Sequence, residues 1–176
     1  MNKKINLLVA VVMAGTSGAA FAQASATQST TGSTRILQAI SITKQSDLEF
    51  GSIVRPATAG TNTITIDATT GARDLTGTGG GALAAGTNSG RATYTVTGEG
   101  GQSFSITPAS TFNMNRVGGG GTIAVNVTAS AATGALSGDI GSSGTANFGV
   151  GGNFDVADTT ATGNYTGTFN VVVAYN

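Results

Sequence analysis

The C-terminal residues decide the fold: Tyr165-Thr166-Gly167-Thr168-Phe169-Asn170-Val171-Val172-Val173-Ala174-Tyr175-Asn176. Aromatic, apolar and glycine residues occupy every second position, and mostly threonine and asparagine stand between them. A period of two residues is typical of a β-strand that has one face on a hydrophobic core. The stretch therefore predicts one continuous strand whose inner face carries Tyr165, Phe169, Val171, Val173 and Tyr175.

The same alternation recurs upstream, in short segments that begin after Arg35. Within each segment the apolar residues are mostly spaced by two: Ile36, Ile40 and Ile42; Leu48, Phe50 and Val54; Ile64 and Ile66; Tyr94 and Val96; Phe104 and Ile106; Ile123, Val125 and Val127; Phe154 and Val156. Turn-forming residues separate the segments, and none keeps a helical period. The sequence therefore predicts an all-β fold, a single antiparallel immunoglobulin-like β-sandwich of about eight strands over residues 35–176. A β-helix solenoid is the alternative, but the chain shows no repeat of fixed period.

The composition excludes most catalytic and metal chemistry. The 176 residues include no His, no Cys and no Trp, and only 9% of them are charged. Ser-His-Asp and Cys-His catalysis, disulfides, and thiolate or imidazole metal sites are therefore excluded. The eight basic residues are scattered and balanced by eight acidic ones, so no basic face for nucleic acid is expected. We expect no enzymatic activity, no cofactor and no catalytic or metal-binding residue.

The first 22 residues have the pattern of a cleaved signal peptide. Lys3 and Lys4 precede a short apolar run, and Ala20-Phe21-Ala22 supplies the small-x-small cleavage site. The apolar run is too short to span a bilayer, and we expect no transmembrane segment in the mature chain. The protein is predicted to be exported to the periplasm, the cell surface or the medium. Residues 23–34, rich in Ser, Thr, Ala and Gln, are predicted to form a flexible polar tail.

Several polar features are candidate sites with an ordinary structural interpretation beside them. The glycine clusters 77–81, 98–101 and 118–121 lack the following helix that a phosphate-binding loop needs, and are interpreted as strand connections. Asp155 and Asp158 leave open a weak calcium site, although six to eight oxygens would have to converge there. Asp47 and Glu49 are interpreted as an exposed strand face. The arginines are expected to pair with the few acids.

The edges of the predicted sheets are unusually poor in protection. Soluble β-proteins guard edge strands with Lys, Pro or inward charges, because unpaired backbone groups recruit other chains. After residue 22 the chain has one lysine, Lys44, and two prolines, Pro56 and Pro108, and residues 165–176 carry no charge. This C-terminal strand is therefore expected either to lie inside a sheet or to be paired by another strand.

The C-terminal residues also resemble those of chaperone–usher pilus subunits. Gly163 is the fourteenth residue from the end, Tyr175 is penultimate, and Tyr165, Phe169, Val171 and Val173 alternate between them. The resemblance implies an incomplete immunoglobulin-like sandwich whose last strand borders a groove for a strand from a neighbour or a periplasmic chaperone. The disulfide common in such subunits is absent here.

The N-terminal segment offers two interpretations within this resemblance. The polar tail makes a poor donor strand, whereas Ile36, Ile40 and Ile42 would make a better one. The same three residues could equally form the first strand of the chain's own domain. The sequence leaves both interpretations open.

A longer resemblance covers the whole mature domain. Leu48-Glu49-Phe50-Gly51, Gly149-Val150-Gly151-Gly152 and the closing stretch from Tyr165 to Asn176 are similar to a bacterial family of exported β-domains of unknown function. This resemblance implies an envelope or surface β-sandwich and brings no activity with it. We expect a non-enzymatic structural or surface protein, a pilin-like subunit that assembles by β-strand addition with itself or a chaperone. A monomeric adhesin or carbohydrate-binding module is the alternative.

Overall fold

A computed structural model describes residues 25–176, so the expected signal peptide lies outside the described residues. The chain divides into two units. The first unit ends at Arg35, and the second begins at Ile36. Residues 25–35 of the first unit form no strand, and every one of them is exposed. The second unit holds all the strands described below.

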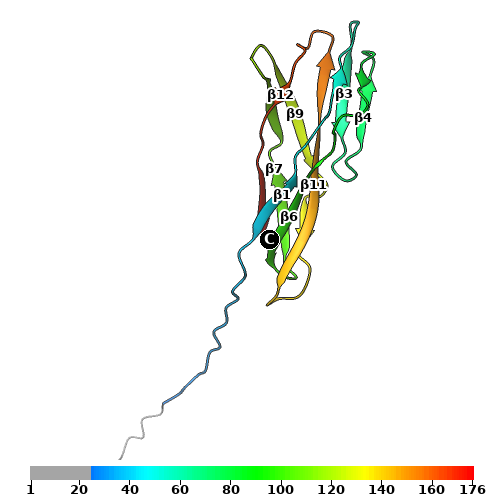
Figure 1. The fold of residues 1–176 in the computed structure, drawn as a ribbon. Coiled ribbons are helices and arrows are strands. Elements are labelled where there is room, and N and C mark those ends of the chain that lie inside the picture. Colours follow the sequence, from blue (N-terminus) through cyan, green and yellow to red (C-terminus); the bar gives the residue numbers. More distant parts are fainter. Residues whose placement is uncertain (1–24) are drawn as a thin grey trace, which may run out of the picture. The chain divides into compact units, whose positions relative to one another are not determined.

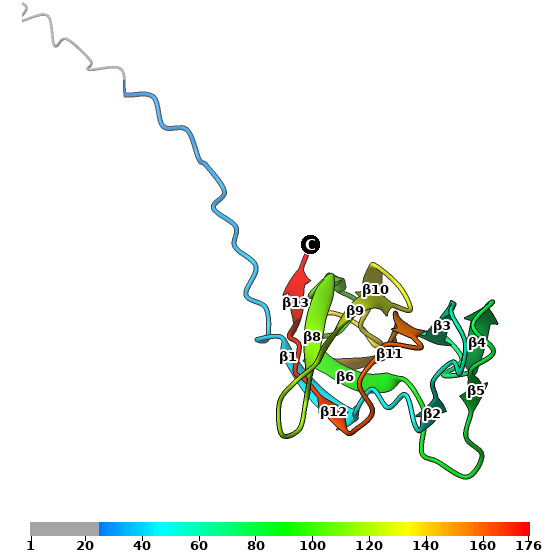
Figure 2. The same ribbon diagram turned by 90° about the horizontal axis from the view of Figure 1, so that it is seen from above.

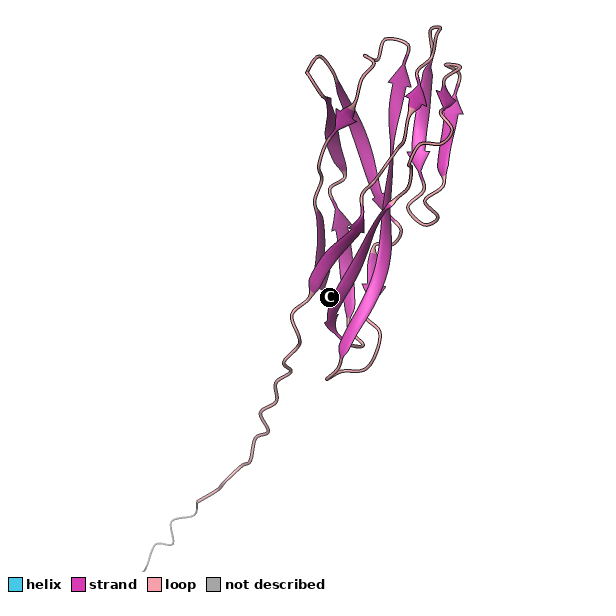
Figure 3. Cartoon of the chain, in the orientation of Figure 1, coloured by secondary structure: helices cyan, strands magenta, loops and turns pink. Residues whose placement is uncertain are grey.

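Residues 25–176 contain strands and no helix (Figure 3), and hence no helix that could cross a membrane. Thirteen strands follow one another in this part of the chain: β1 (Ser41–Ser46), β2 (Ile53–Val54), β3 (Thr61–Ile66), β4 (Arg73–Gly77), β5 (Ala82–Leu83), β6 (Ala92–Glu99), β7 (Ser103–Pro108), β8 (Thr111–Arg116), β9 (Thr122–Ala129), β10 (Thr133–Ala135), β11 (Ser143–Ala157), β12 (Tyr165–Thr166) and β13 (Val171–Tyr175). The predicted all-β class is confirmed.

The strands form one large antiparallel sheet and two small ones (Figures 1 and 2). The large sheet has the order β1-β6-β11-β9-β8-β12, and β3 joins it by pairing with the second half of β11 and with β4. The small sheets are β10-β7-β13 and β2-β5. Because the pairs are antiparallel and the inner faces alternate with polar outer faces, the arrangement is the predicted sandwich type.

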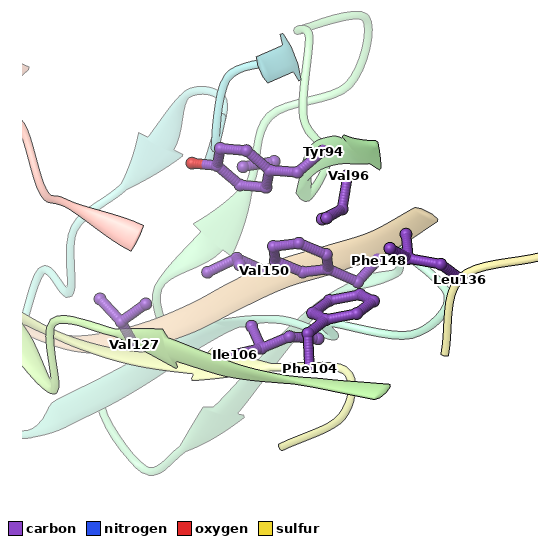
Figure 4. Packing of buried hydrophobic residues seen from close by; sticks show 9 residues of the cluster. Tyr94, Val96, Phe104, Ile106, Val127, Leu136, Phe148 and Val150 are labelled. Atoms are coloured by element: carbon purple, nitrogen blue, oxygen red, sulfur yellow. The ribbon is translucent and has the colours of Figure 1, made fainter. Parts of the chain in front are cut away.

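Two hydrophobic clusters fill the interior. The first lies between the large sheet and β10-β7-β13, where Phe104 from β7 and Phe148 from β11 point into the same space (Figure 4). The second lies where the large sheet curls, and Phe50 meets Phe154 there edge to face at 4.8 Å between ring centroids. The inner residues of the central strands are fully enclosed: Val96, Val125 and Val150 are each 0% exposed.

The glycines of the Gly149-Val150-Gly151-Gly152 motif lie where three strands meet on β11. The first half of β11 pairs with β6, the second half with β3, and residues 150–153 pair with β9. A Cβ at Gly151 would lie 2.1 Å from the Ile66 carbonyl oxygen, and one at Gly152 would lie 2.5 Å from the Asn126 oxygen. Glycine is therefore required at these positions, because the backbones of the neighbouring strands approach β11 so closely.

The prediction of one continuous C-terminal strand is wrong. Residues 165–176 form two strands, β12 and β13, which pair with different partners in different sheets. Gly167 lies between them, where a Cβ would be 2.3 Å from the Asn113 oxygen. The side-chain alternation nevertheless continues across the break. The prediction of about eight strands also missed β4, β8 and the short strands β5 and β10.

Candidate functional site

The C-terminal segment lies at a sheet edge in both of its halves. Within the described part of the chain, β12 pairs only with β8, and β13 pairs only with β7. The segment is therefore not an interior strand. The sequence left two expectations for this uncharged segment, an interior strand or an edge strand. The structure places it at an edge.

The backbone hydrogen bonds of this segment alternate between its two sides. Asn170 accepts a bond from Ala109 N at 2.9 Å, and Asn176 donates one to Ser103 O at 3.2 Å. In an antiparallel ladder every second residue bonds the same neighbour, so the even-numbered residues of β13 bond with β7. Beside β8, Asn164 accepts a bond from Val117 N at 2.8 Å, which continues the same parity.

The odd-numbered residues consequently direct their backbone groups to the other side. The N–H and C=O groups of Val171, Val173 and Tyr175 point away from β7, and no residue from 25 to 176 pairs with them. Those of Tyr165 point away from β8 in the same way. We call this side of residues 165–175 the open edge.

The side chains along the open edge are only partly covered. Tyr165, Phe169, Val171, Val173 and Tyr175 are all half-buried, and the residues between them are exposed. The inner face of this segment is therefore as predicted from the sequence. Equivalent valines in the central strands are completely enclosed. The core is thus left incompletely covered along the open edge.

A cavity of about 570 Å³ lies at the Tyr165 end of the open edge. Its apolar lining includes Phe50, Met114, Ile123 and Phe154, and residues 48–53 and 160–165 also line it. Arg55 stands at its rim and donates a hydrogen bond to the Thr160 oxygen at 2.8 Å. We call this space the end cavity. It is large enough to take a bulky apolar side chain.

The opposite end of the open edge is closed by a hydrogen-bond network. The Tyr175 hydroxyl accepts a bond from Glu99 N at 2.7 Å and donates one to the Gln38 oxygen at 2.8 Å. The buried Glu99 carboxylate accepts bonds from Gln38 N, at 3.0 Å, and from Gly141 N. A Cβ at Gly98 would lie 2.2 Å from the Tyr175 hydroxyl oxygen, so a larger residue there would displace this hydroxyl. We call this network the Tyr175 junction.

The three predicted N-terminal residues have different surroundings. Ile42 lies in β1, opposite Val96 of β6, and both Ile40 and Ile42 pack on the first hydrophobic cluster. In this chain they therefore belong to its own sandwich. Ile36 is 88% exposed and contacts no part of the core. Gly163, singled out from its spacing, precedes β12 with a φ of +148° beside Arg116.

Charge is sparse around the open edge. An ion pair joins Lys44 and Asp47 near the end of β1, and the hydrogen bond from Lys44 to this carboxylate raises the pKa of Lys44. Glu49 is exposed and forms a backbone bridge with Gly90. Asp155 accepts a hydrogen bond from Thr63 at 2.6 Å. Among residues 25–176, no three His, Cys, Asp or Glu side chains gather where they could hold a metal ion.

The expectation that the arginines pair with acids is wrong for four of them. Arg55, Arg73, Arg91 and Arg116 donate to backbone carbonyl oxygens of loops. A guanidinium group carries five N–H donors, so a side chain such as Arg73 reaches the carbonyls of Phe50 and Ala84 at once. These four arginines hold loops in place through hydrogen bonds to their carbonyl groups.

Some parts of the site could not be found from sequence reasoning. Glu99 lies within the glycine cluster 98–101, which the sequence indicates only as a strand connection. The end cavity brings together residues more than 100 positions apart, and no sequence pattern encodes that meeting. For the open edge, the signals in the sequence are the lack of charge in residues 165–176, the alternation of their side chains and the spacing of Gly163 and Tyr175.

Comparison with known proteins gives one match. The family described as Domain of unknown function (DUF4402) matches residues 40–175. No curated protein and no solved structure matches the chain significantly.

Proposed function

The chain belongs to the family described as Domain of unknown function (DUF4402), and we propose that it is a structural protein that takes up an added β-strand along its open edge. In this proposal the protein is exported, acts without catalysis, and assembles as a pilin-like subunit. Its partner is a strand of another chain, either a further subunit or a periplasmic chaperone. The observation that carries the proposal is the row of unpaired backbone groups above a partly uncovered core.

The backbone of the open edge supports strand addition. An added strand would pair with the outward N–H and C=O groups of Tyr165, Val171, Val173 and Tyr175. Natural proteins blunt free edges with charged side chains or proline. Charged residues occur on the edge strand β4, as Arg73 and Asp74, but none occurs in residues 165–176. Residues 165–176 are thus a long edge segment without charged protection.

The side chains support the same proposal. A strand added beside residues 165–175 would cover the half-buried row and so remove apolar surface from water. Residues 38–55 would flank it on the other side, because they meet residues 160–175 at the Tyr175 junction and at the end cavity. The end cavity would accept one large side chain of the added strand and thereby set its register.

The alternative, a monomeric adhesin or carbohydrate-binding module, has less support. Sugar-binding surfaces of this kind use exposed aromatic rings for stacking. Every aromatic side chain among residues 25–176 is buried or half-buried. Three of the half-buried ones, Tyr165, Phe169 and Tyr175, belong to the open edge, and Phe112 of β8 packs on Phe169. An added strand would cover the three rings of the open edge.

Amide hydrogen exchange tests the proposal residue by residue. In the dilute chain beginning at Gln23, the amides of Val171, Val173 and Tyr175 should exchange fast, while those of Val172 and Ala174 should be protected by β7. At concentrations where the protein associates, the odd-numbered amides should become protected as well. NMR exchange combined with analytical ultracentrifugation measures both properties. A protein that stays monomeric at every concentration and protects its odd-numbered amides in that state would overturn the proposal.

A proline variant separates folding from strand addition. Val173→Pro removes an N–H on the open edge and leaves the bonds of β13 to β7 in place, so the monomer should fold. It should lose association as measured by sedimentation. Val172→Ser, on the exposed outer face of the same strand, is the matched control and should associate like the unmodified chain. Equal association of both variants would count against the open edge.

A further inference from the structure

The ladder between β9 and β11 ends before either strand does. Its last pair is Asn126 with Asn153, although each strand has four further residues beyond that pair. On their other sides both stretches stay paired, β9 with β8 and β11 with β3. The large sheet is therefore split between β9 and β11, which run apart toward this end of the sandwich (Figure 1). We call the gap between residues 122–125 and residues 154–157 the fork.

Backbone hydrogen bonds show which groups point into the fork. The N–H of Val127 bonds on the β8 side of β9, so the even-numbered Thr122 and Ala124 direct their N–H and C=O groups toward β11. The oxygen of Gly149 bonds on the β9 side of β11, so Asp155, of the same parity, directs its groups toward β9. Within residues 25–176 no strand pairs with these groups across the fork.

A cavity of about 540 Å³ lies in the fork, and its outer side is polar. The side chains of Thr122, Asn126 and Asp155 belong to the outer face of the sheet and line this cavity. Among the described residues that line it, only Asp155 is charged. The Asp155 carboxylate accepts one bond, from the Thr63 hydroxyl at 2.6 Å, and the Asn126 amide nitrogen donates to Asn153 at 3.1 Å. A second carboxylate oxygen and the Asn126 amide oxygen are left as acceptors.

The inner side of the fork adjoins the end cavity. Ile123 and Phe154 alternate with the outward residues, so they lie on the inner face of the sheet, and both line the fork and the end cavity. Residues 160–161 and Tyr165 also line both spaces. The two cavities are therefore neighbours, polar at the outer face of the sheet and largely apolar toward Met114 inside.

This two-part space suits a molecule with a cationic head and an apolar tail. A primary ammonium group carries three N–H donors and one positive charge. The Asp155 carboxylate, the Asn126 amide oxygen and the Ala124 carbonyl oxygen are acceptors at the fork, and the carboxylate favours a cation over a neutral or anionic head. A short alkyl chain in the end cavity would leave water for an apolar lining, which is favourable.

We propose that the fork and the end cavity together bind one small amphipathic amine, with its ammonium group at Asp155 and its apolar tail beside Ile123 and Phe154 in the end cavity. The inference rests on the two cavities and does not depend on strand addition. The tail would occupy the space that an added strand uses for its large side chain, so the amine and that side chain exclude each other.

An NMR titration with three six-carbon probes tests the chemistry of the site. The probes are hexylamine, hexanol and hexanoate, added at pH 7 to the dilute monomeric chain that begins at Gln23. Hexylamine should shift the amide signals of Thr122, Ala124 and Asp155 and the methyl signal of Met114 along one binding curve. Hexanol should bind at least tenfold more weakly, and hexanoate should give no saturable shift.

The length of the tail tests the end cavity. Propylamine has the same head and three fewer methylene groups, and each buried methylene group contributes about fourfold in affinity. Propylamine should therefore bind at least tenfold more weakly than hexylamine. Equal affinity of the two amines, or shifts at the fork without a shift of the Met114 methyl group, would overturn the placement of the tail. Equal affinity of hexylamine and hexanol would overturn recognition of the ammonium group.

Two carboxylate variants locate the head. Asp155→Asn keeps an oxygen for the bond from Thr63 and removes the charge, so it should weaken hexylamine at least tenfold and leave the affinity for hexanol unchanged. Asp74→Asn is the matched control, because Asp74 is an exposed acid of the same sheet and lines neither cavity. It should bind hexylamine like the unmodified chain. An equal loss in both variants would mean attraction of cations to the surface in general, and would overturn the site.

The failure of this inference is distinguishable from failure of the proposed function. If none of the probes shifts any signal, the fork and the end cavity hold only water, and the inference is overturned. Strand addition is measured without any amine, by amide exchange and sedimentation, so that result would leave it standing.

Discussion

At the residue scale, the most constrained positions are glycines that let backbones approach. Gly151→Ala would place a Cβ 2.1 Å from the Ile66 oxygen, a contact that neither backbone can relieve by a side-chain rotation. The expected loss is about 1–3 kcal/mol in the free energy of unfolding, or more if β3 separates from β11. Urea denaturation measures it.

Gly90→Ala is the control for that substitution. Nothing lies within 4 Å of its Cβ position, and its φ is not in the left-handed region. Its stability should therefore stay within about 0.5 kcal/mol of the unmodified chain. If both variants lose the same stability, the close approach of strands at Gly151 is not the cause.

Asp67 carries a pH dependence whose sign follows from its contacts. The Asp67 carboxylate accepts bonds from the Thr70 amide at 2.6 Å, the Thr70 hydroxyl at 2.8 Å and the Thr69 amide at 2.9 Å. The amide and hydroxyl of Thr70 are the main causes that lower its pKa. Stability from this turn is thus present above the ordinary Asp pKa of about 3.9 and is lost as the pH falls through the lowered folded value.

NMR titration checks this expectation directly. The carboxyl carbon of Asp67 should titrate below the ordinary Asp range. In Thr70→Val, which lacks the hydroxyl, its pKa should move back toward that range. An Asp67 pKa at or above the ordinary value in the unmodified chain would contradict the hydrogen bonds of this turn.

At the element scale, the small sheet β2-β5 depends on one arginine of β4. Arg73 donates to the Phe50 oxygen at 3.0 Å and to the Ala84 oxygen at 2.9 Å, which ties both flanks of this sheet to the large one. Arg73→Met removes two charge-assisted bonds while keeping much of the stem. We expect a loss of about 1–3 kcal/mol in the free energy of unfolding.

Arg55→Met is the comparison for this prediction. Arg55 is exposed and bonds one carbonyl, that of Thr160, so its removal should cost no more than about 0.5 kcal/mol. Hydrogen exchange should locate the effect of Arg73→Met in residues 50–54 and 82–84. Faster amide exchange spread evenly over the sandwich would argue against a local role of Arg73 in holding the β2-β5 sheet.

The elements also show what sequence patterns can and cannot predict. Alternation identified the inner face of residues 165–175, because side-chain parity depends only on the local backbone. It could not reveal the exchange of partners at Gly167, because the same parity holds whether β8 or β7 is the neighbour. β4 was missed because charged Arg73 and Asp74 leave Leu75 as its single large apolar residue. The end cavity depends on tertiary contacts alone.

At the scale of the whole molecule, the proposed strand addition predicts the behaviour of mixtures of chains with an intact and a blocked open edge. Val173→Pro lacks one N–H on the open edge and should not accept an added strand. Mixed with the full chain, it should shorten assemblies in proportion to its fraction.

Sedimentation velocity measures the length distribution in such mixtures. The control Val172→Ser should leave the length distribution unchanged, because Val172 lies on the exposed outer face of β13. Assemblies of unchanged length in mixtures with Val173→Pro would contradict strand addition at the open edge.

The Tyr175 junction has a mechanical consequence. The backbone of Gln38 is bonded both to the Glu99 carboxylate at the end of β6 and to the hydroxyl of Tyr175 at the end of β13. A pull on the tail is therefore divided between the large sheet and the small one at the point where it enters the body. The force then acts along β1, which pairs with β6. The hydrogen bonds between these two strands are therefore loaded in shear and must break together, not one after another.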